Sequence, residues 1–275
     1  MRNTTKTILF FVLLSIPVSA LAFFISGIFA VEIVLILYIW IIYGLYMYSG
    51  KIILKWYRAE KVGVLKKLSE KAGISSVGMY NFNSPIPFIF TVGTSSEYNV
   101  ALSTGAMGMF DVAEIEVLLA REIGHIKNGD VPINTITALF AGSLVGVSSA
   151  AFRLSLMAVF GKKNNLIPKL VRFFIMGLVA LPAALLVQLM ISSSREYAAD
   201  EVVEGMTGRP NLLPKMLKRF ESQLESFHRQ INPGHAHLFP VNFLYIENAY
   251  DVHLPMFNTH PDIGKRIDNL IKKGE

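Results

Sequence analysis

The alternation of apolar and polar segments along the chain predicts several membrane-associated helices. Two apolar runs stand at the N-terminus, from Ile8 to Val31 and from Ile33 to Tyr48, with only Glu32 between them. Each is close to the ~20 residues that a helix needs to cross a bilayer. We therefore expect a hairpin of two spanning helices, with its turn at Ser26–Gly27 or at residues 30–32. A signal peptide is the alternative, but the second run that follows at once argues against it.

Two further apolar runs lie in the middle of the chain, from Ile133 to Phe152 and from Phe173 to Ile191. If both crossed the bilayer, the basic loop between them would lie outside the cell, against the positive-inside rule. We expect both runs to be embedded in the membrane, and the pattern leaves their depth open. The basic residues of this loop are Lys162, Lys163, Lys169 and Arg172.

The rest of the chain has the mixed pattern of a globular domain, so we expect a mainly α protein with a small β-sheet (α+β). Asp111 and Glu114 form a capping box before one predicted helix, and Asn128–Gly129 is a typical helix stop. The expected elements are helices at Ala59–Ala72, Val112–Lys127, Asn211–Arg229 and Ile263–Lys273, strands at Phe88–Val92 and Asn99–Thr104, and a loop at Asn232–Gly234. The expected divisions are the hairpin at 1–50, a globular part at 51–132, the embedded segments at 133–191 and a second globular part at 192–275.

The composition supports the membrane interpretation. Hydrophobic residues make up 52% of the 275 residues and charged residues 17%, against about a quarter charged in soluble domains. The net charge of +6 favours a membrane surface over nucleic acid, because the basic residues cluster beside the apolar runs. They flank both open ends of the hairpin, which predicts a multi-pass cell-membrane protein with its globular part in the cytoplasm. The absence of cysteine excludes disulfides and thiolate metal sites.

The segment Leu118–Asp130 reads LLAREIGHIKNGD and differs by one residue from a zinc-protease helix. In the pattern H-E-x-x-H, two histidines on one helix face bind Zn²⁺ and the glutamate acts as general base. Here Glu122 and His125 hold the base and second-ligand positions, while Arg121 stands where the first histidine is needed. A guanidinium cannot bind zinc, because it stays protonated and has no lone pair to offer. E-x-x-H alone is common on helices and therefore a weak signal.

The chain nevertheless resembles the HtpX family of membrane zinc endopeptidases, gluzincin-type proteases related to the CAAX prenyl proteases. The family pattern A-H-E-L-G-H-I-K-N-x-D corresponds to residues 120–130, and R-E-Y-x-A-D is matched in full by Arg195–Asp200. The part of the family stretch that reads V-A-L-T-x-G lies at residues 100–105 here, and the family's S-T-H-P segment lies at residues 258–261. The resemblance covers nearly the whole chain.

The resemblance implies a membrane-bound zinc endopeptidase that cleaves misfolded membrane proteins. It implies that Glu122 is the catalytic base and that His125 and Glu196 are ligands of Zn²⁺. Asp200 would accept the free N–H of His125 or of a neighbour, or it is merely solvated on its helix. His260 would stabilise an oxyanion or contact substrate, or it is an ordinary loop residue.

The strand before the motif helix is the candidate substrate-binding strand. In the related proteases an edge strand pairs with extended substrate backbone, whereas an ordinary interior strand is the alternative. The candidate residues are Ala101, Leu102, Ser103 and Thr104. His235 and His237 resemble a local metal pair, although two histidines in a loop are more often solvated. His228 and His253 show no role.

Arg121 leaves three outcomes open. In the first, Arg121 pairs with Glu196 beside Glu122 and offsets the buried carboxylates without a metal, which makes a pseudoprotease. In the second, the arginine is particular to this chain, and its parent protein is an active enzyme. In the third, zinc binds weakly through His125, Glu196 and a nearby histidine. We expect a zinc-endopeptidase-like protein in which zinc is weakly bound or absent. The alternative is a non-catalytic protein that binds extended polypeptides or regulates an active partner.

Overall fold

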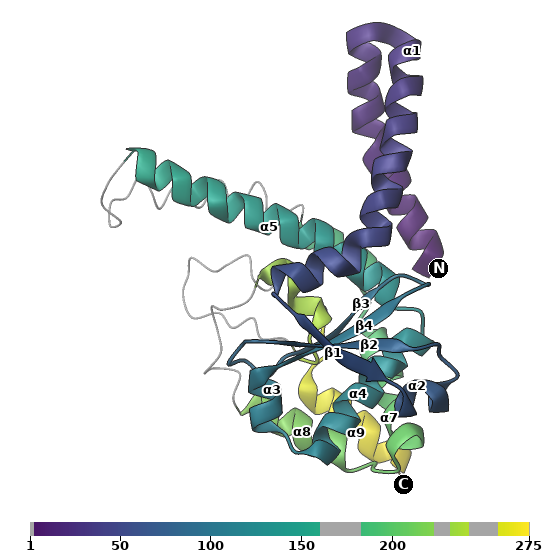
Figure 1. Ribbon diagram of the computed structural model, residues 1–275, viewed down its shortest axis with the longest axis vertical. Coiled ribbons are helices and arrows are strands. Elements are labelled where there is room, and N and C mark those ends of the chain that lie inside the picture. Colours follow the sequence, from purple (N-terminus) through teal and green to yellow (C-terminus); the bar gives the residue numbers. More distant parts are fainter. Residues whose placement is uncertain (1–2, 160–182, 223–231, 242–257, 275) are drawn as a thin grey trace.

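The computed structural model describes residues 3–159, 183–222, 232–241 and 258–274 (Figure 1). A long helical hairpin projects from a globular part, in which helices pack against a small sheet. The mainly α fold with a small sheet is confirmed. Some expected features lie outside the described residues: the basic loop between the middle apolar runs, the first part of the run from Phe173, the end of the helix predicted at Asn211–Arg229, and residues His228 and His253.

The N-terminal helix α1 (Asn3–Trp56) contains the hairpin that its two apolar runs predict. The chain reverses at Ser26 and Gly27, and the φ of Gly27 is 71°, which glycine adopts without steric cost. The turn at Ser26–Gly27 is therefore confirmed. Phe24 and Phe29 are 85% and 76% exposed, so the tip of the hairpin presents apolar side chains that the described residues do not cover. Among the described residues, this is the helix that is long and apolar enough to cross a membrane.

Four strands form one mixed sheet in the order β1-β2-β4-β3. β2 and β4 run parallel, and the β1–β2 and β3–β4 pairs are antiparallel. The prediction of a helix at Ala59–Ala72 was wrong for its first half, which forms strand β1, and right for its second half, which forms a helix. The first half becomes a strand because its pairing with β2 outweighs the local sequence pattern. The strands are β1 (Glu60–Leu65), β2 (Val77–Phe82), β3 (Ile89–Gly93) and β4 (Tyr98–Ser103), and α2 (Lys67–Ala72) follows β1.

The edge role expected for the strand before the motif helix was wrong. β4 is an interior strand, because β2 and β3 pair with its two sides. The backbones of the candidate residues in β4 are therefore already used within the sheet, and Thr104 begins helix α3 (Thr104–Met109). β3 and β1 form the two edges of the described sheet. The candidate residues affected are Ala101, Leu102, Ser103 and Thr104.

Helix α4 (Val112–Lys127) carries the motif and begins as its sequence predicts. The Asp111 carboxylate accepts the Glu114 N–H at 2.8 Å, and the Glu114 carboxylate accepts the Asp111 N–H at 3.0 Å. This capping box is confirmed, as is the stop at Asn128 and Gly129. The other helices of the globular part are α7 (Ser194–Thr207), α8 (Leu212–Glu221), the 3₁₀ helix η2 (Pro233–Leu238) and α9 (Ile263–Gly274).

A second apolar cluster lies at the base of the hairpin. The first turns of α5 (Val131–Val159) pack there against residues 183–191 and against Phe10 of α1. The rings of Phe10 and Phe140 meet edge to face at 5.4 Å. The described apolar stretch of α5, Val131–Gly146, is shorter than a membrane span. A multi-span arrangement therefore stays a prediction.

Candidate functional site

Helices α4 and α7 touch at Gly124, and this contact assembles the candidate site. A Cβ atom at Gly124 would lie 2.8 Å from the Ala199 carbonyl oxygen, so only glycine permits the approach. The contact places the motif residues of α4 opposite the downstream acidic motif of α7. His125 Nε2 lies 3.8 Å from Glu196 Oε1, so the two expected ligand positions meet although they are far apart in sequence.

The guanidinium of Arg121 is buried between three carboxylates. Its Nη1 donates to Glu122 at 2.9 Å and its Nε donates to Asp200 at 3.1 Å, while Nη2 donates to Glu196. Burial alone would lower the pKa of Arg121, but the charges of Glu196, Asp200 and Glu122 outweigh burial and raise it. Arg121 is 1% exposed, so this cation is a permanent part of the core.

Glu122 and Glu196 both accept hydrogen bonds from Arg121. Burial alone would raise the pKa of Glu196, but Arg121, with His260 and His125, holds it well below its ordinary value. The second carboxylate oxygen of Glu122 accepts a hydrogen bond from Thr91 Oγ1 of β3 at 2.7 Å. Both oxygens of Glu122 therefore already have donors. No sequence signal pointed to Thr91, because a threonine in a strand is unremarkable.

His125 is oriented by Asp130 and not by Asp200. Its Nδ1 lies 3.2 Å from Asp130 Oδ2, and Asp130 in turn lies 3.5 Å from Arg195 Nε. Asp200 was expected to accept an N–H of His125 or of a neighbour, and it accepts from the neighbour, Arg121 Nε, at 3.1 Å. Asp200 is 1% exposed, so the alternative of a solvated side chain was wrong. Asp130 follows the helix stop directly, so the turn folds its carboxylate back onto the last turn of α4. That placement was a signal that sequence reasoning overlooked.

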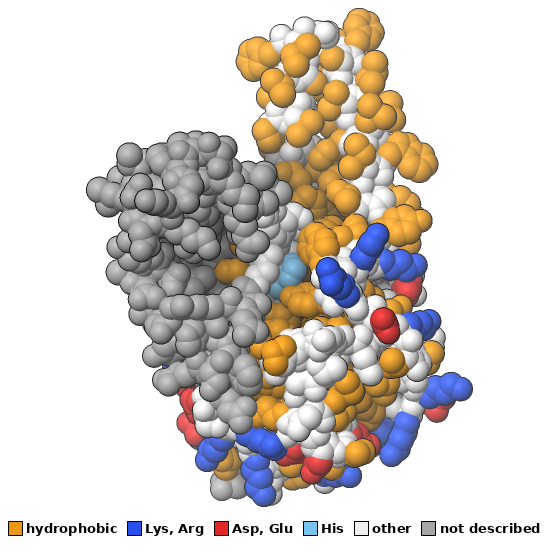
Figure 2. Space-filling model, turned by 60° about the vertical axis from the view of Figure 1, so that its left-hand side comes forward, with side chains coloured by type: hydrophobic (Ala, Val, Ile, Leu, Met, Phe, Trp, Pro, Cys, Tyr) orange, Lys and Arg blue, Asp and Glu red, His pale blue; other side chains and the backbone are white. Residues whose placement is uncertain are grey.

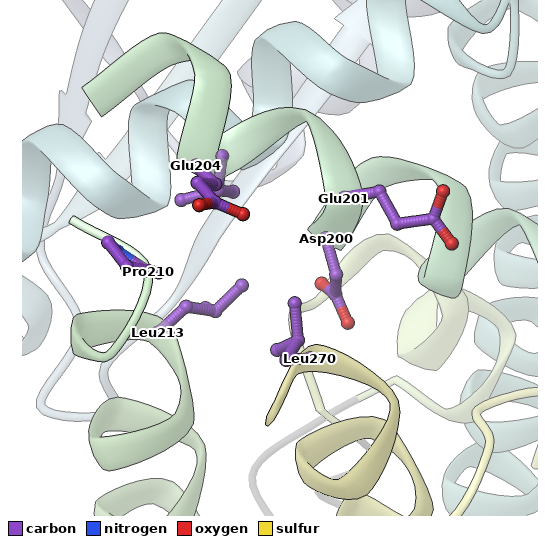
Figure 3. A pocket seen from close by; sticks show the side chains of 7 residues that line it. Asp200, Glu201, Glu204, Pro210, Leu213 and Leu270 are labelled. Atoms are coloured by element: carbon purple, nitrogen blue, oxygen red, sulfur yellow. The ribbon is translucent and has the colours of Figure 1, made fainter. Parts of the chain in front are cut away.

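Arg266 of α9 is another buried arginine, and sequence reasoning missed it. It donates to both oxygens of Asp200 at 2.8 Å and to the Pro240 carbonyl at 2.6 Å. Figure 3 shows Asp200 pointing from α7 toward α9, beside a cavity of about 40 Å³ between α7, α8 and α9. Ligand pockets measure roughly 300–1,000 Å³, so this cavity is too small for a substrate. Asp200 thus joins two arginines and links α9 to the site.

His260 lies against the site, with its Nδ1 3.4 Å from Glu196 Oε2. Its Nε2 lies 3.1 Å from the Ala236 carbonyl oxygen. The imidazole therefore links η2 to the acidic motif of α7. A role toward an oxyanion or a substrate stays a prediction.

His235 and His237 of η2 are buried and not solvated. His235 Nδ1 lies 2.9 Å from the Tyr57 hydroxyl, and the Trp56 ring stacks on the imidazole at 5.5 Å. His237 Nε2 lies 3.0 Å from the Asn134 carbonyl oxygen. Burial lowers the pKa of His235 to about 3 and that of His237 to about 4, so both are neutral. They pack η2 against α5.

The side chains of the site do not fit a zinc ion. Arg121 stands at the first-ligand position, and its guanidinium already forms ion pairs with both Glu122 and Glu196. Within the described residues, no group of three or more His, Asp or Glu side chains is arranged to hold a metal. The outcome in which Arg121 pairs with Glu196 beside Glu122 matches this geometry. His260 lies near Glu196, but Arg121 already bonds to that carboxylate, so weak zinc binding through a replacement histidine stays a prediction.

Comparison with known proteins shows the family. Residues 59–273 match the model of peptidase family M48. A relative named protease HtpX homolog, from Pelotomaculum thermopropionicum, is 34% identical over 239 residues, which are 82% of this chain and 83% of the relative. Proteins of the same name from Pyrococcus furiosus and Thermodesulfovibrio yellowstonii are 34% and 30% identical, over 82% and 98% of this chain and 81% and 97% of theirs. No solved structure gives a significant match. The chain belongs to peptidase family M48, a zinc-dependent metalloprotease family, and is an HtpX-type member of it.

Proposed function

We propose that this chain is a membrane-anchored, metal-free member of the family, which binds polypeptide segments without hydrolysing them. The observation that carries the proposal is the Arg121 guanidinium, which bonds to Glu122, Glu196 and Asp200 in the core. Its globular part would face the cytoplasm beside a multi-pass membrane region. Its binding partners would be polypeptides, with misfolded membrane proteins as the class that the family resemblance implies.

The electrostatics of the site oppose zinc binding. A Zn²⁺ ion between His125 and Glu196 would lie close to a fixed positive charge, and two unit charges 4 Å apart already repel by about 4 kcal/mol at an effective dielectric of 20. Moving Arg121 aside would break buried ion pairs, and breaking one typically costs about 3–5 kcal/mol. In a zinc site the metal would supply an activated water. The residues of this chain do not support that chemistry.

Polypeptide binding is the part of the activity that does not require a metal. The hydrogen bonds from Thr94 N–H to Glu97 and from Ser103 N–H to Phe88 set the register of the β3–β4 pair. In that register the backbone groups of Ile89 and Thr91 point away from β4, as an added strand requires. Both residues are buried here, so the edge must be uncovered before a polypeptide pairs with it.

A second candidate function is zinc-dependent endopeptidase activity, which the names of the relatives suggest. The observation that favours it is the retained pair of His125 and Glu196, whose polar atoms lie 3.8 Å apart. The metal content of the purified chain separates the two candidates.

Substituting Arg121→His tests the proposed function. We expect the natural chain to contain no bound zinc and to show no chelator-sensitive cleavage of casein. The variant should bind about one zinc per chain, because the substitution completes the ligand set and removes the repelling charge. Zinc is measured by atomic emission and cleavage with and without chelator. Arg209→His, at an exposed arginine, is the matched control and should gain neither property. One tightly bound zinc in the natural chain would overturn the proposal.

Hydrogen exchange tests the binding step separately. Unfolded casein in excess should slow exchange of the Ile89 and Thr91 amides in the natural chain, because an added strand would accept their N–H groups. The amides of β1, at the opposite edge of the sheet, are the control and should not change. Protection at β1 alone, or at neither edge, would contradict polypeptide binding at β3.

A further inference from the structure

We propose that the base of the hairpin holds a binding site for anionic phospholipid headgroups. The site consists of four exposed basic residues, which we name the basic collar: Lys51, Lys55, Arg58 and Lys61. Its occupant is the leaflet that surrounds the open ends of the hairpin. This inference is independent of the proposed function, because it uses no residue of the Arg121 cluster.

The basic collar begins where the apolar surface of the hairpin ends. Tyr48 is 61% exposed, whereas Ser49, Ile53 and Leu54 are buried, so α1 passes from the membrane surface into the globular part within a few residues. Figure 1 shows the last turns of α1 running obliquely to the hairpin. Figure 2 shows Lys and Arg side chains gathered at the base of the apolar hairpin. Headgroups of the leaflet occupy this level.

The arrangement of the basic collar suits phosphate groups. Lys51 and Lys55 are one helical turn apart on the same face of α1, and Arg58 follows directly after the helix. Lys51 lies 3.3 Å from Glu97 in an exposed ion pair. Within the described part of the chain, Lys55 and Arg58 form no ion pair, so their charges are available. Long basic side chains at this depth reach the headgroup layer.

The backbone at Arg58 is an independent observation in favour of a functional cation. Its φ is 52°, the one positive value among the described non-glycine residues. Arg58 N–H bonds to the Lys55 carbonyl and Ala59 N–H to the Leu54 carbonyl, which is the Schellman ending of a helix. Glycine is the residue that this position favours, since other residues are strained there. The chain carries an arginine instead, which the helix ending does not require.

Trp56 supplies a built-in reporter of the site. It is 45% exposed and stacks on His235, in the position between apolar and wet surroundings that tryptophan prefers at membrane interfaces. Trp40, in the hairpin, is the other of the two tryptophans in the chain. The substitution Trp40→Phe therefore leaves Trp56 as the single tryptophan of the full-length protein.

The test follows Trp56 emission of the full chain carrying Trp40→Phe in neutral detergent. Short-chain phosphatidylglycerol should shift the emission with a saturating curve, while phosphatidylcholine and inorganic phosphate should not. Arg58→Gly should weaken the apparent affinity about five-fold and, with Lys55→Gln added, at least ten-fold. Arg58→Gly should also keep or raise the melting temperature, because glycine relieves the backbone strain.

The matched control is the pair Lys215→Gln and Lys218→Gln on α8, which removes two exposed charges away from the hairpin. It should leave the response to phosphatidylglycerol unchanged. An equal response to phosphatidylcholine, or an unchanged affinity after Arg58→Gly with Lys55→Gln, would overturn the proposal. A response to inorganic phosphate alone would also overturn it, because the site would then bind a soluble anion and not a lipid headgroup.

Discussion

The guanidinium of Arg121 carries its charge into a core that also holds Glu122, Glu196 and Asp200. In the family pattern a neutral histidine stands here, so the positive charge of a metal would have to balance the carboxylates. Arg121 offers several N–H donors in a fixed plane, which lets one side chain bond to three acids. An organic cation thus balances the negative charges around it.

Removing this cation should unfold the protein more easily than removing an exposed one. Arg121→Leu leaves Glu122 buried without its positive partner and removes the nearest cation from Glu196, and we expect the free energy of unfolding to fall by about 3–5 kcal/mol. Arg209→Leu breaks an exposed ion pair with Glu116 and should cost less than about 1 kcal/mol. Denaturant unfolding in mild detergent, followed by circular dichroism, measures both. An equal decrease in the free energy of unfolding for the two variants would contradict a stabilising role of Arg121 in the core.

Two buried histidines should make the fold sensitive to mild acid. In the folded chain the pKa of His235 is about 3 and that of His237 about 4, below the ordinary value of 6.5. As pH falls below 6.5, the unfolded chain takes up protons that the folded chain refuses, so stability decreases by about 1.4 kcal/mol per pH unit for each histidine. The melting temperature should therefore fall from pH 7 to pH 5.

The substitution His235→Gln serves as the control for this pH dependence, because glutamine retains polar atoms but does not titrate. We expect it to reduce the slope of melting temperature against pH by about half, since His237 remains. Measurements between pH 7 and pH 5 stay above the ordinary range of carboxylates. A melting temperature that is constant over this interval would contradict the burial of neutral histidines.

At the scale of elements, the sequence predicted correctly those features that depend on neighbouring residues within one element. The capping box at Asp111 and the stop at Gly129 bound the motif helix, because both act through neighbouring residues. The segment from Ala59 was misread, because β1 exists through its pairing with β2. The place of β4 inside the sheet was misread for the same reason. Strand order depends on contacts between distant segments, which no local periodicity encodes.

The closest approach of α4 and α7 depends on Gly124. Gly124→Ala places a Cβ against the Ala199 backbone, and we expect a loss of about 1–3 kcal/mol as the helices separate. Gly205→Ala, at an open position on α7, is the matched control and should be neutral or stabilising by up to about 1 kcal/mol. Thermal unfolding of the two variants compares them. A Gly124→Ala protein as stable as the control would show that the helix contact is loose.

At the scale of the whole molecule, an apolar hairpin and a charged globular part meet at the base of α1. The arms of the hairpin expose large apolar side chains, and the cluster of α5 with residues 183–191 packs against its base. A hairpin that spans the bilayer would place the globular part directly beside the membrane surface. The basic residues after Gly50 predict that this surface is the cytoplasmic one.

The absence of cysteine allows a direct test of this orientation. Ser26→Cys places a single thiol at the turn of the hairpin, and Ser222→Cys places one after α8. In intact cells a membrane-impermeant maleimide should label the first variant and not the second. Inverted membrane vesicles should reverse the result. Labelling of the Ser222→Cys protein in intact cells would place the globular part outside and contradict the charge rule.

The sequence by itself determined the hairpin, the motif helix and the family, because each depends on residues that are neighbours in the chain. Only the tertiary structure decided what surrounds position 121. The partners of Glu122 and Arg121 in this cluster include Thr91, 31 positions away, and Asp200, 79 positions away. Arg266 reaches Asp200 from 66 positions away. Which charged side chains are buried together depends on how helices and strands pack. The order of residues along the chain does not give the distances between side chains of different elements.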